Sequence, residues 1–236
     1  MERIELATPE GPVEATVAHP AGPGPWPGVV IVHDMVSATS GGLPGIIGRV
    51  ADAGHLAIAP NLYSRGGPIR CVTRVVRELR SLSGRAFDDV HASRDWLIAD
   101  PRCNGKVGIL GFCMGGGFAL VMATHGFDAA APFYPSFPAD RYDEILDGAC
   151  PVVASFGRRD PVLPKAGPRL EKGLTDRRIT HDVKIYDDTG HSFANPYPAA
   201  PLLRIVGFAY DQASADDAWG RVFTFFDEHL QPAAPG

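Results

Sequence analysis

A glycine-rich heptapeptide at residues 111–117, Gly-Phe-Cys-Met-Gly-Gly-Gly, most constrains how this chain folds. The run 105–110 before it predicts a strand, and the run 118–123 after it predicts a helix. Glycines on both sides of Cys113 permit a turn too tight for side chains. A cysteine at such a turn projects above the sheet edge, where backbone N–H groups and the helix dipole favour a thiolate. A buried structural cysteine among close-packed glycines is the alternative interpretation.

Apolar runs alternate with amphipathic segments along most of the chain, which predicts an α/β fold. We expect a mostly parallel central sheet with helices on both faces, preceded by an antiparallel hairpin that turns at the Pro/Gly cluster 9–12. The predicted strands are 4–7, 13–18, 29–32, 56–59, 107–110, 129–133, 152–156 and 183–186. The predicted helices are 43–53, 84–99, 114–125, 140–147, 165–174 and 214–230.

The chain has 236 residues, which suits one α/β domain spanning residues 1–236. Its 27 glycines and 22 prolines are scattered among apolar segments without a repeat, which argues against disorder and against collagen. Residues 193–213 are rich in proline and aromatic residues and follow no period. Because structureless loops this long are usually functional, we expect this segment to lie over the active site.

A net charge of −5 and a pI near 5.9 give no electrostatic reason to bind nucleic acid. No apolar stretch approaches the roughly 20 residues that cross a bilayer, and the N-terminus is too charged for a signal peptide, so we expect a cytoplasmic protein without membrane contact. The four cysteines include no CxxC pair, which predicts neither disulfides nor a metal site. Cys71, Cys103 and Cys150 are expected to be structural.

Three potential catalytic residues each follow a predicted strand, in the order Cys113, Asp160, His191. Nucleophile, acid and histidine in this order are typical of α/β-hydrolase triads, and parallel strands bring all three to one rim of the sheet. Taken alone, Asp160 also suits a turn initiator and His191 a loop histidine. Asp187 and Asp188 are competing acids, but they lie so close to His191 in sequence that they reach its far nitrogen poorly. Asp160 is therefore preferred.

An acyl transfer site also needs donors for the developing oxyanion. In this fold the donors are the backbone N–H of the residue after the nucleophile and one from the loop after the third strand. These positions are Met114 and Met35. Removal of one such donor typically lowers the rate by about 10²–10³.

With these residues assembled, the sequence resembles the dienelactone hydrolase family of α/β-hydrolases. The resemblance implies that Cys113 attacks a lactone or ester and forms a thioester, that His191 acts as base and then as acid, and that Asp160 orients His191. It also implies that no metal or organic cofactor takes part, and it gives a monomer as the default. The stretches that carry the resemblance are 29–34, 59–63, 104–108, 111–116, 133–134, 157–160 and 190–194.

Two departures from the family pattern bear on the substrate. Asp34 stands where well-known members carry a glutamate that engages the resting cysteine. Its alternative role is to cap the loop that follows it. Asn195 stands where members that act on dienelactone have a carboxylate-binding arginine, so a neutral ester or lactone becomes the expected substrate. Arg65 is a candidate to reach the pocket. Five aromatic residues are candidates for an apolar pocket wall or, alternatively, for the core: Phe133, Tyr134, Phe193, Tyr197 and Phe208.

The leading prediction is a cysteine-dependent hydrolase of carboxylic esters or lactones. A thioesterase or a broad carboxylesterase shares the same elbow and triad, so the sequence leaves both open. A thiol-sensing or binding protein that has kept the fold and lost turnover is the alternative from another functional class.

Overall fold

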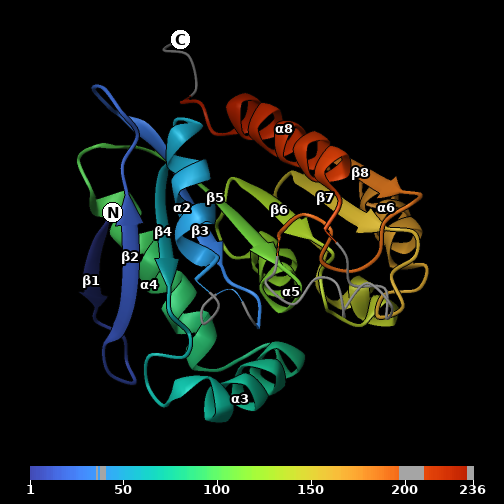
Figure 1. Cartoon of the computed structure of the whole chain (residues 1–236), viewed down its shortest axis with the longest axis horizontal. Coiled ribbons are helices and arrows are strands. Elements are labelled where there is room, and N and C mark those ends of the chain that lie inside the picture. Colours follow the sequence, from blue (N-terminus) through green and yellow to red (C-terminus); the bar gives the residue numbers. More distant parts are fainter. Residues whose placement is uncertain (36, 38–40, 197–209, 233–236) are drawn as a thin grey trace.

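The computed structural model describes residues 1–35, 37, 41–196 and 210–232, and it is built on an eight-stranded sheet (Figure 1). The strand order is β1-β2-β4-β3-β5-β6-β7-β8. The β1–β2 and β2–β4 pairs are antiparallel and the others are parallel, which confirms the predicted hairpin and mostly parallel sheet. The strands are β1 (Glu2–Leu6), β2 (Val13–Ala18), β3 (Trp26–Val32), β4 (Leu56–Pro60), β5 (Cys103–Phe112), β6 (Ala129–Phe133), β7 (Val152–Gly157) and β8 (His181–Tyr186).

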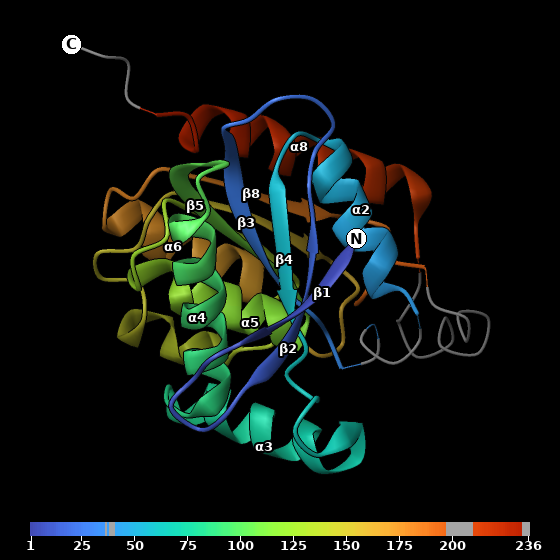
Figure 2. The same ribbon diagram turned by 90° about the vertical axis from the view of Figure 1, so that its left-hand side faces the viewer.

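Helices cover both faces of the sheet, as expected for strands that alternate with helices (Figure 2). Helices α2 and α8 pack on one face, and α3, α4, α5 and α6 contribute to the core on the other. The helices are α2 (Leu43–Asp52), α3 (Gly67–Ser81), α4 (Arg85–Ala99), α5 (Met114–Val121), α6 (Ala166–Asp176) and α8 (Gln212–His229).

The central strand β3 shows why both faces must be covered. Its consecutive residues point to opposite faces. Val30 and Val32 join the core under α3 to α6, whereas Val29 and Ile31 join the core under α2 and α8. All four are fully buried, so this continuous β-branched run is stable only between two layers of helices.

Helix α3 is absent from the helices that the sequence predicted. Pro68 lies in the first helical turn, where the N–H that proline lacks would have no partner within the helix. The helix buries one stripe, Cys71, Val75 and Leu79, at four-residue spacing. Arginines on its other side concealed that stripe in the sequence.

Two other predicted helices are shorter than expected. The segment 140–147 forms a 3₁₀ helix, Ala139–Glu144, instead of an α-helix. Its buried anchors Tyr142 and Ile145 are three residues apart, the spacing that aligns side chains in a 3₁₀ helix. Helix α5 ends at Val121 and continues as the 3₁₀ turn Met122–Thr124.

The candidate residues Tyr197 and Phe208 lie outside the described residues, as does most of the predicted 193–213 loop. The end of this segment is helical, because α8 begins at Gln212. Within the described ranges, no helix is long and apolar enough to cross a membrane.

Candidate active site

Cys113 occupies a strained position between β5 and α5, as the sharp turn predicts. Its backbone has φ 53° and ψ −116°, in a region that residues other than glycine rarely adopt. Three backbone hydrogen bonds hold this conformation: Cys113 N–H donates to the Phe133 carbonyl at 3.1 Å, and the Cys113 carbonyl accepts from Gly117 at 2.9 Å and from Ser136 at 2.8 Å. The cysteine is thereby fixed at the carboxyl end of the sheet, where α5 begins.

The glycines around Cys113 are required by close backbone contacts. A Cβ on Gly111 would lie 2.1 Å from the Gly115 carbonyl oxygen, and a Cβ on Gly115 would lie 2.1 Å from the Val32 carbonyl oxygen. A Cβ on Gly116 would lie 2.5 Å from the Phe133 carbonyl oxygen. These distances are shorter than any real side chain tolerates, so the glycines let α5 start directly against β3, β5 and β6.

His191 and Asp160 form a direct pair, in agreement with their placement after neighbouring strands β7 and β8. Nδ1 of His191 lies 2.7 Å from Oδ2 of Asp160, and both side chains are 1% exposed. The other carboxylate oxygen, Oδ1, accepts backbone N–H bonds from Val162 at 2.8 Å and from Leu163 at 3.2 Å. Both oxygens of the carboxylate thus take part in hydrogen bonds, and the carboxylate fixes the orientation of the imidazole ring.

The protonation of His191 is governed by two neighbours. Burial of the ring lowers its pKa, but hydrogen bonds to the Asp160 carboxylate and to the Cys113 sulfur outweigh burial and raise the pKa to about 9. An imidazole of this basicity carries a proton at neutral pH. The structure therefore brings together the three residues that the sequence singled out, with His191 bonded to both of the others.

The competing acids Asp187 and Asp188 face away from this pair. Asp187 pairs with Arg158, and Asp188 lies 2.5 Å from Arg159. Both carboxylates are more than two-thirds exposed, at 72% and 86%. Their charges are therefore solvated and paired, and Asp160 is the carboxylate that contacts His191.

Ser136 is a neighbour of Cys113 that the sequence analysis did not identify. Its Oγ lies 3.4 Å from Sγ of Cys113, and its backbone N–H donates to the Cys113 carbonyl. Ser136 reaches the cysteine because Tyr134, with a positive φ of 35°, turns the chain back after β6. A serine three residues beyond a predicted strand end was the available signal, but serines are common in such turns.

A buried histidine shapes the loop that carries the predicted oxyanion donor Met35. Nδ1 of His33 lies 2.7 Å from the Asp34 carbonyl oxygen, and Nε2 accepts the Leu62 N–H at 3.1 Å. Burial lowers the pKa of His33, so the ring is neutral with its proton on Nδ1. The ring thus ties the end of β3 to the chain that leaves β4.

Asp34 has the capping contact that its alternative interpretation anticipates. It is 3% exposed, and its Oδ1 accepts the Ser37 N–H at 2.7 Å. The side chain of Met35 is 42% exposed. Met114 is the first residue of α5, so its backbone N–H is one of the free donors at the helix N-terminus.

The described aromatic candidates are buried, as the core alternative anticipates. Phe133, Tyr134 and Phe193 are all fully buried. Phe133 packs on Trp219, with ring centroids 5.4 Å apart, because the side chains at the end of β6 point under α8. Tyr134 lies beside the catalytic candidates instead, with its ring 5.0 Å from that of His191.

Two polar pocket candidates have different surroundings. Asn195 is 6% exposed and its Nδ2 donates to the Tyr134 hydroxyl at 3.5 Å, close to His191. Arg65 is engaged elsewhere, which corrects its predicted role. Its guanidinium contacts both oxygens of Asp89, at 2.6 and 2.7 Å, and the Gly11 carbonyl at 2.9 Å. Asp89 is fully buried and needs this cation, so Arg65 holds the β1–β2 turn on α4.

The chain matches the model of the dienelactone hydrolase family over residues 13–230. A putative carboxymethylenebutenolidase of Yersinia pestis is 26% identical to it over 231 residues, covering 90% of this chain and 82% of that protein. The carboxymethylenebutenolidase of Pseudomonas putida is 25% identical over 176 residues, covering 70% of this chain and 75% of that protein.

Solved structures show the same fold. A putative dienelactone hydrolase from Klebsiella pneumoniae subsp. pneumoniae MGH 78578 superposes with a TM-score of 0.80 at 22% identity, covering 96% of this chain and 98% of that one. A dienelactone hydrolase-like promiscuous phosphotriesterase from metagenomic libraries gives 0.78 at 20% identity, covering 98% of both chains. The predicted α/β-hydrolase fold is therefore confirmed. Together with the family match over nearly the whole sequence, this places the chain in the dienelactone hydrolase family.

Proposed function

We propose that the chain hydrolyses a carboxylic ester or lactone with Cys113 as nucleophile, His191 as base and then acid, and Asp160 as the group that orients His191. Hydrolysis of this bond type agrees with the family and with relatives named carboxymethylenebutenolidase. The observation that carries the assignment is the position of His191, which hydrogen-bonds both to the acid and to the sulfur.

In the first half-reaction, Sγ of Cys113 attacks the carbonyl carbon while His191 holds the thiol proton. The backbone N–H groups of Met35 and Met114 stabilise the negative charge that develops on the carbonyl oxygen. As the C–O bond to the leaving group breaks, His191 gives its proton to the departing alkoxide. The products of this step are an alcohol and a thioester on Cys113.

In the second half-reaction, water attacks the thioester carbonyl and His191 accepts a proton from it. The C–S bond breaks, the sulfur leaves as a thiolate beside the protonated His191, and the carboxylic acid departs. Throughout both steps the Asp160 carboxylate accepts a hydrogen bond from Nδ1–H of His191 and stabilises the imidazolium. For a lactone, the alcohol and the acid are the two ends of one product.

A pocket of about 330 Å³ next to Ser136 supports this assignment. Ser136, which contacts Cys113, lines the pocket together with Phe137, Val162 and Leu163. Val162 and Leu163 belong to the turn that holds Asp160. Arg80 and Arg169 also line this pocket, so its wall offers both apolar surface and positive charge to an ester.

We also propose that neutral esters or lactones are preferred over anionic ones. Asn195 supplies an amide where dienelactone-processing members carry a positive charge, and Arg65 is already paired with Asp89. Since neither of these two positions offers a free guanidinium, a substrate carboxylate gains less from binding near His191.

The test is turnover of 4-nitrophenyl acetate, 4-nitrophenyl butyrate, a neutral lactone and cis-dienelactone. Wild type, Cys113→Ala and the matched thiol control Cys103→Ala are compared, with circular dichroism as a check on folding. Activity that disappears only in Cys113→Ala supports the proposed function. Full activity in Cys113→Ala contradicts it, and a marked preference for cis-dienelactone contradicts the proposed neutral substrate. A thiol that alkylates without any turnover of the panel points to the thiol-sensing alternative.

A further inference from the structure

Tyr134 lies where the turn beside the nucleophile meets the segment that carries His191. Two residues of this turn contact the backbone of Cys113, Phe133 through its carbonyl and Ser136 through its N–H. The Tyr134 side chain contacts the histidine instead. Its ring centroid lies 5.0 Å from that of His191, and both side chains are buried. One turn thus contacts both the cysteine and the histidine.

The Tyr134 side chain contacts every second residue of the segment 191–195. Beyond His191, its ring lies 5.5 Å from that of Phe193 in an edge-to-face arrangement. Its hydroxyl accepts a long hydrogen bond of 3.5 Å from Nδ2 of Asn195. Phe193 is fully buried and Asn195 is 6% exposed, so little solvent reaches these contacts. A single side chain therefore supports the histidine segment from its first residue to its last.

The backbone of Tyr134 is strained. Its φ of 35° lies in the left-handed region that bulky residues rarely adopt. Its N–H donates to the Ser155 carbonyl at 2.7 Å, which holds the chain in this conformation where β6 ends. Strained residues other than glycine persist where their surroundings over-determine them, and they cluster at active sites. A glycine would relieve the strain, so a large aromatic residue at this position points to a requirement for its side chain.

The hydrogen bond with Asp160 leaves part of the motion of the imidazole open. It holds Nδ1 of His191 at 2.7 Å, but the ring can still tilt about that contact. Such a tilt moves Nε2 away from Sγ of Cys113, with which His191 exchanges a proton. A rigid ring packed against the imidazole limits the tilt. This matters because a misplacement of about 1 Å can lower a rate by about 10².

We infer that Tyr134 is a positioning residue for the proposed hydrolysis. Its ring packs on the imidazole of His191 and keeps Nε2 directed at Cys113, and the Asn195 amide holds the ring by its hydroxyl. Asn195 thereby has a role that needs no contact with the substrate. The inference rests on the proposed function, in which His191 moves the proton of Cys113.

Tyr134→Met and Tyr134→Phe separate the flat ring from the volume that it fills. Methionine fills much of the same space with a flexible chain, whereas phenylalanine keeps the ring and lacks the hydroxyl. With 4-nitrophenyl butyrate we expect Tyr134→Met to lower kcat at least about twentyfold and to leave KM within about threefold. Tyr134→Phe should recover kcat to within about fivefold of wild type. Equal values of kcat in the two variants contradict the role of the ring.

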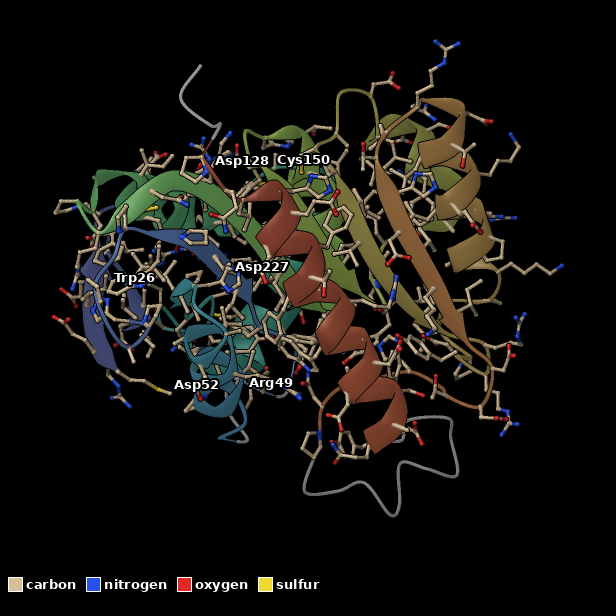
Figure 3. All side chains as sticks on the ribbon, turned by 90° about the horizontal axis from the view of Figure 1, so that it is seen from above. Trp26, Arg49, Asp52, Asp128, Cys150 and Asp227 are labelled. Atoms are coloured by element: carbon tan, nitrogen blue, oxygen red, sulfur yellow. The ribbon has the colours of Figure 1, made fainter. Side chains whose placement is uncertain are left out.

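Phe226→Leu is the matched control for lost packing. Phe226 is fully buried in α8, and Figure 3 shows the next residue, Asp227, near the C-terminal end of that helix. A Cβ on Gly108 would lie 3.2 Å from the Phe226 ring, and Gly108 pairs with Ala129, the first residue of β6. Tyr134 follows the last residue of that strand, so the two rings lie toward opposite ends of the sheet.

The control should lower the thermal midpoint as Tyr134→Met does, yet keep kcat within about twofold of wild type. If kcat falls equally in Phe226→Leu and Tyr134→Met, lost stability accounts for both and the inference is overturned.

Asn195→Ala tests the contact with the hydroxyl. Alone it should lower kcat about two- to fivefold, as Tyr134→Phe does. Because both changes remove the same contact, the double variant should lose no more than either single variant, and additive losses contradict the contact. If Tyr134→Met does not fold, Asn195→Ala and Tyr134→Phe decide, and unchanged kcat in both overturns the inference.

Alkylation of Cys113 by iodoacetamide tests the same geometry without a substrate. The rate is followed at the Cys113 peptide by mass spectrometry from pH 5 to 10. Because an imidazolium beside the sulfur favours the reactive thiolate, the rate should reach its plateau at a higher pH in Tyr134→Met than in wild type. Phe226→Leu should match wild type, and a profile of Tyr134→Met identical to wild type overturns the inference. Absence of ester turnover in wild type would contradict the proposed function, whereas the expected difference between the alkylation profiles would still support the positioning of His191.

Discussion

Ser136 holds Cys113 by two contacts, an Oγ to Sγ distance of 3.4 Å and a 2.8 Å hydrogen bond from its N–H to the Cys113 carbonyl. The backbone bond fixes the strained turn, and the hydroxyl is placed to donate to the sulfur when the sulfur is negatively charged. Ser136 therefore joins the residues around the nucleophile from the turn after β6, a strand that is followed by no member of the predicted triad.

Replacement of Ser136 by alanine keeps the backbone bond and removes only the hydroxyl. One hydrogen bond of about 1 kcal/mol corresponds to an approximately fivefold loss in kcat/KM and in the rate of alkylation by iodoacetamide. Both rates are measured from pH 5 to 10, beside the exposed control Ser83→Ala. If Ser136→Ala matches wild type across this range, the hydroxyl does not act on the thiol.

The raised pKa of His191 predicts a titration far above that of an ordinary histidine. In wild type, NMR of the imidazole carbons should give a pKa of about 9. In Cys113→Ala the pKa should fall, because one of the two hydrogen bonds that raise it is lost, whereas Cys103→Ala should leave it unchanged. A pKa near 6.5 in wild type would contradict the geometry of the site.

The same shift makes the stability of the fold depend on pH. Since the folded-state pKa lies above the unfolded value of 6.5, the folded protein binds the proton more tightly. The resulting stabilisation is complete below pH 6.5 and is lost as the pH rises toward and through 9. Urea unfolding of wild type and His191→Gln should show a stability difference at pH 6 that shrinks at pH 9.5. If the difference in unfolding free energy between the two proteins grows with pH, the predicted pKa shift of His191 is contradicted.

Asp160→Asn tests which carboxylate orients His191. The amide removes the charge that stabilises the imidazolium, so kcat/KM should fall about a hundredfold or more, yet by less than in Cys113→Ala. Asp187→Asn and Asp188→Asn are matched controls with exposed, arginine-paired carboxylates, and each should stay within about twofold of wild type. A larger loss in either control would transfer the acid role to that residue.

Gly115→Ala tests the close approach of α5 to β3. Its Cβ would overlap the Val32 carbonyl oxygen at 2.1 Å, where backbone cannot give way. We expect a loss of at least about 3 kcal/mol in the free energy of unfolding. Gly220→Ala in α8 is the control, because its Cβ meets nothing within 4 Å, and it should stabilise the helix by about 0.5–1 kcal/mol. Equal denaturant midpoints for the two variants would refute the packing argument.

The sequence predicted those features that depend on local pattern and chain order. The heptapeptide around Cys113 specifies its own turn, and Asp160 and His191 each follow a strand, so parallel pairing alone brings them to one rim. The hairpin at the N-terminus and the two-sided sheet follow from the same local signals.

Features that depend on contacts between distant parts of the chain could not be predicted from the sequence. An aromatic residue such as Phe133 suits a pocket or a core equally, and only its position under α8 decides for the core. Arg65 and Asp89 are distant in sequence, so no local pattern predicts their buried ion pair. Ser136 reaches Cys113 only through the turn at Tyr134, and the stripe of α3 lay hidden among arginines.

The neutral ring of His33, bonded at both nitrogens, makes the loop of Asp34 and Met35 sensitive to acid. A proton on Nε2 would remove the acceptor of the Leu62 N–H and bury a charge, which is why the pKa of His33 is lowered. Stability from this ring is present above pH 6.5 and declines as the pH falls toward its lowered pKa. The two histidines thus limit the stability of the fold from opposite sides of the pH range. Acid weakens the link that His33 makes between β3 and β4, and alkali removes the proton from His191.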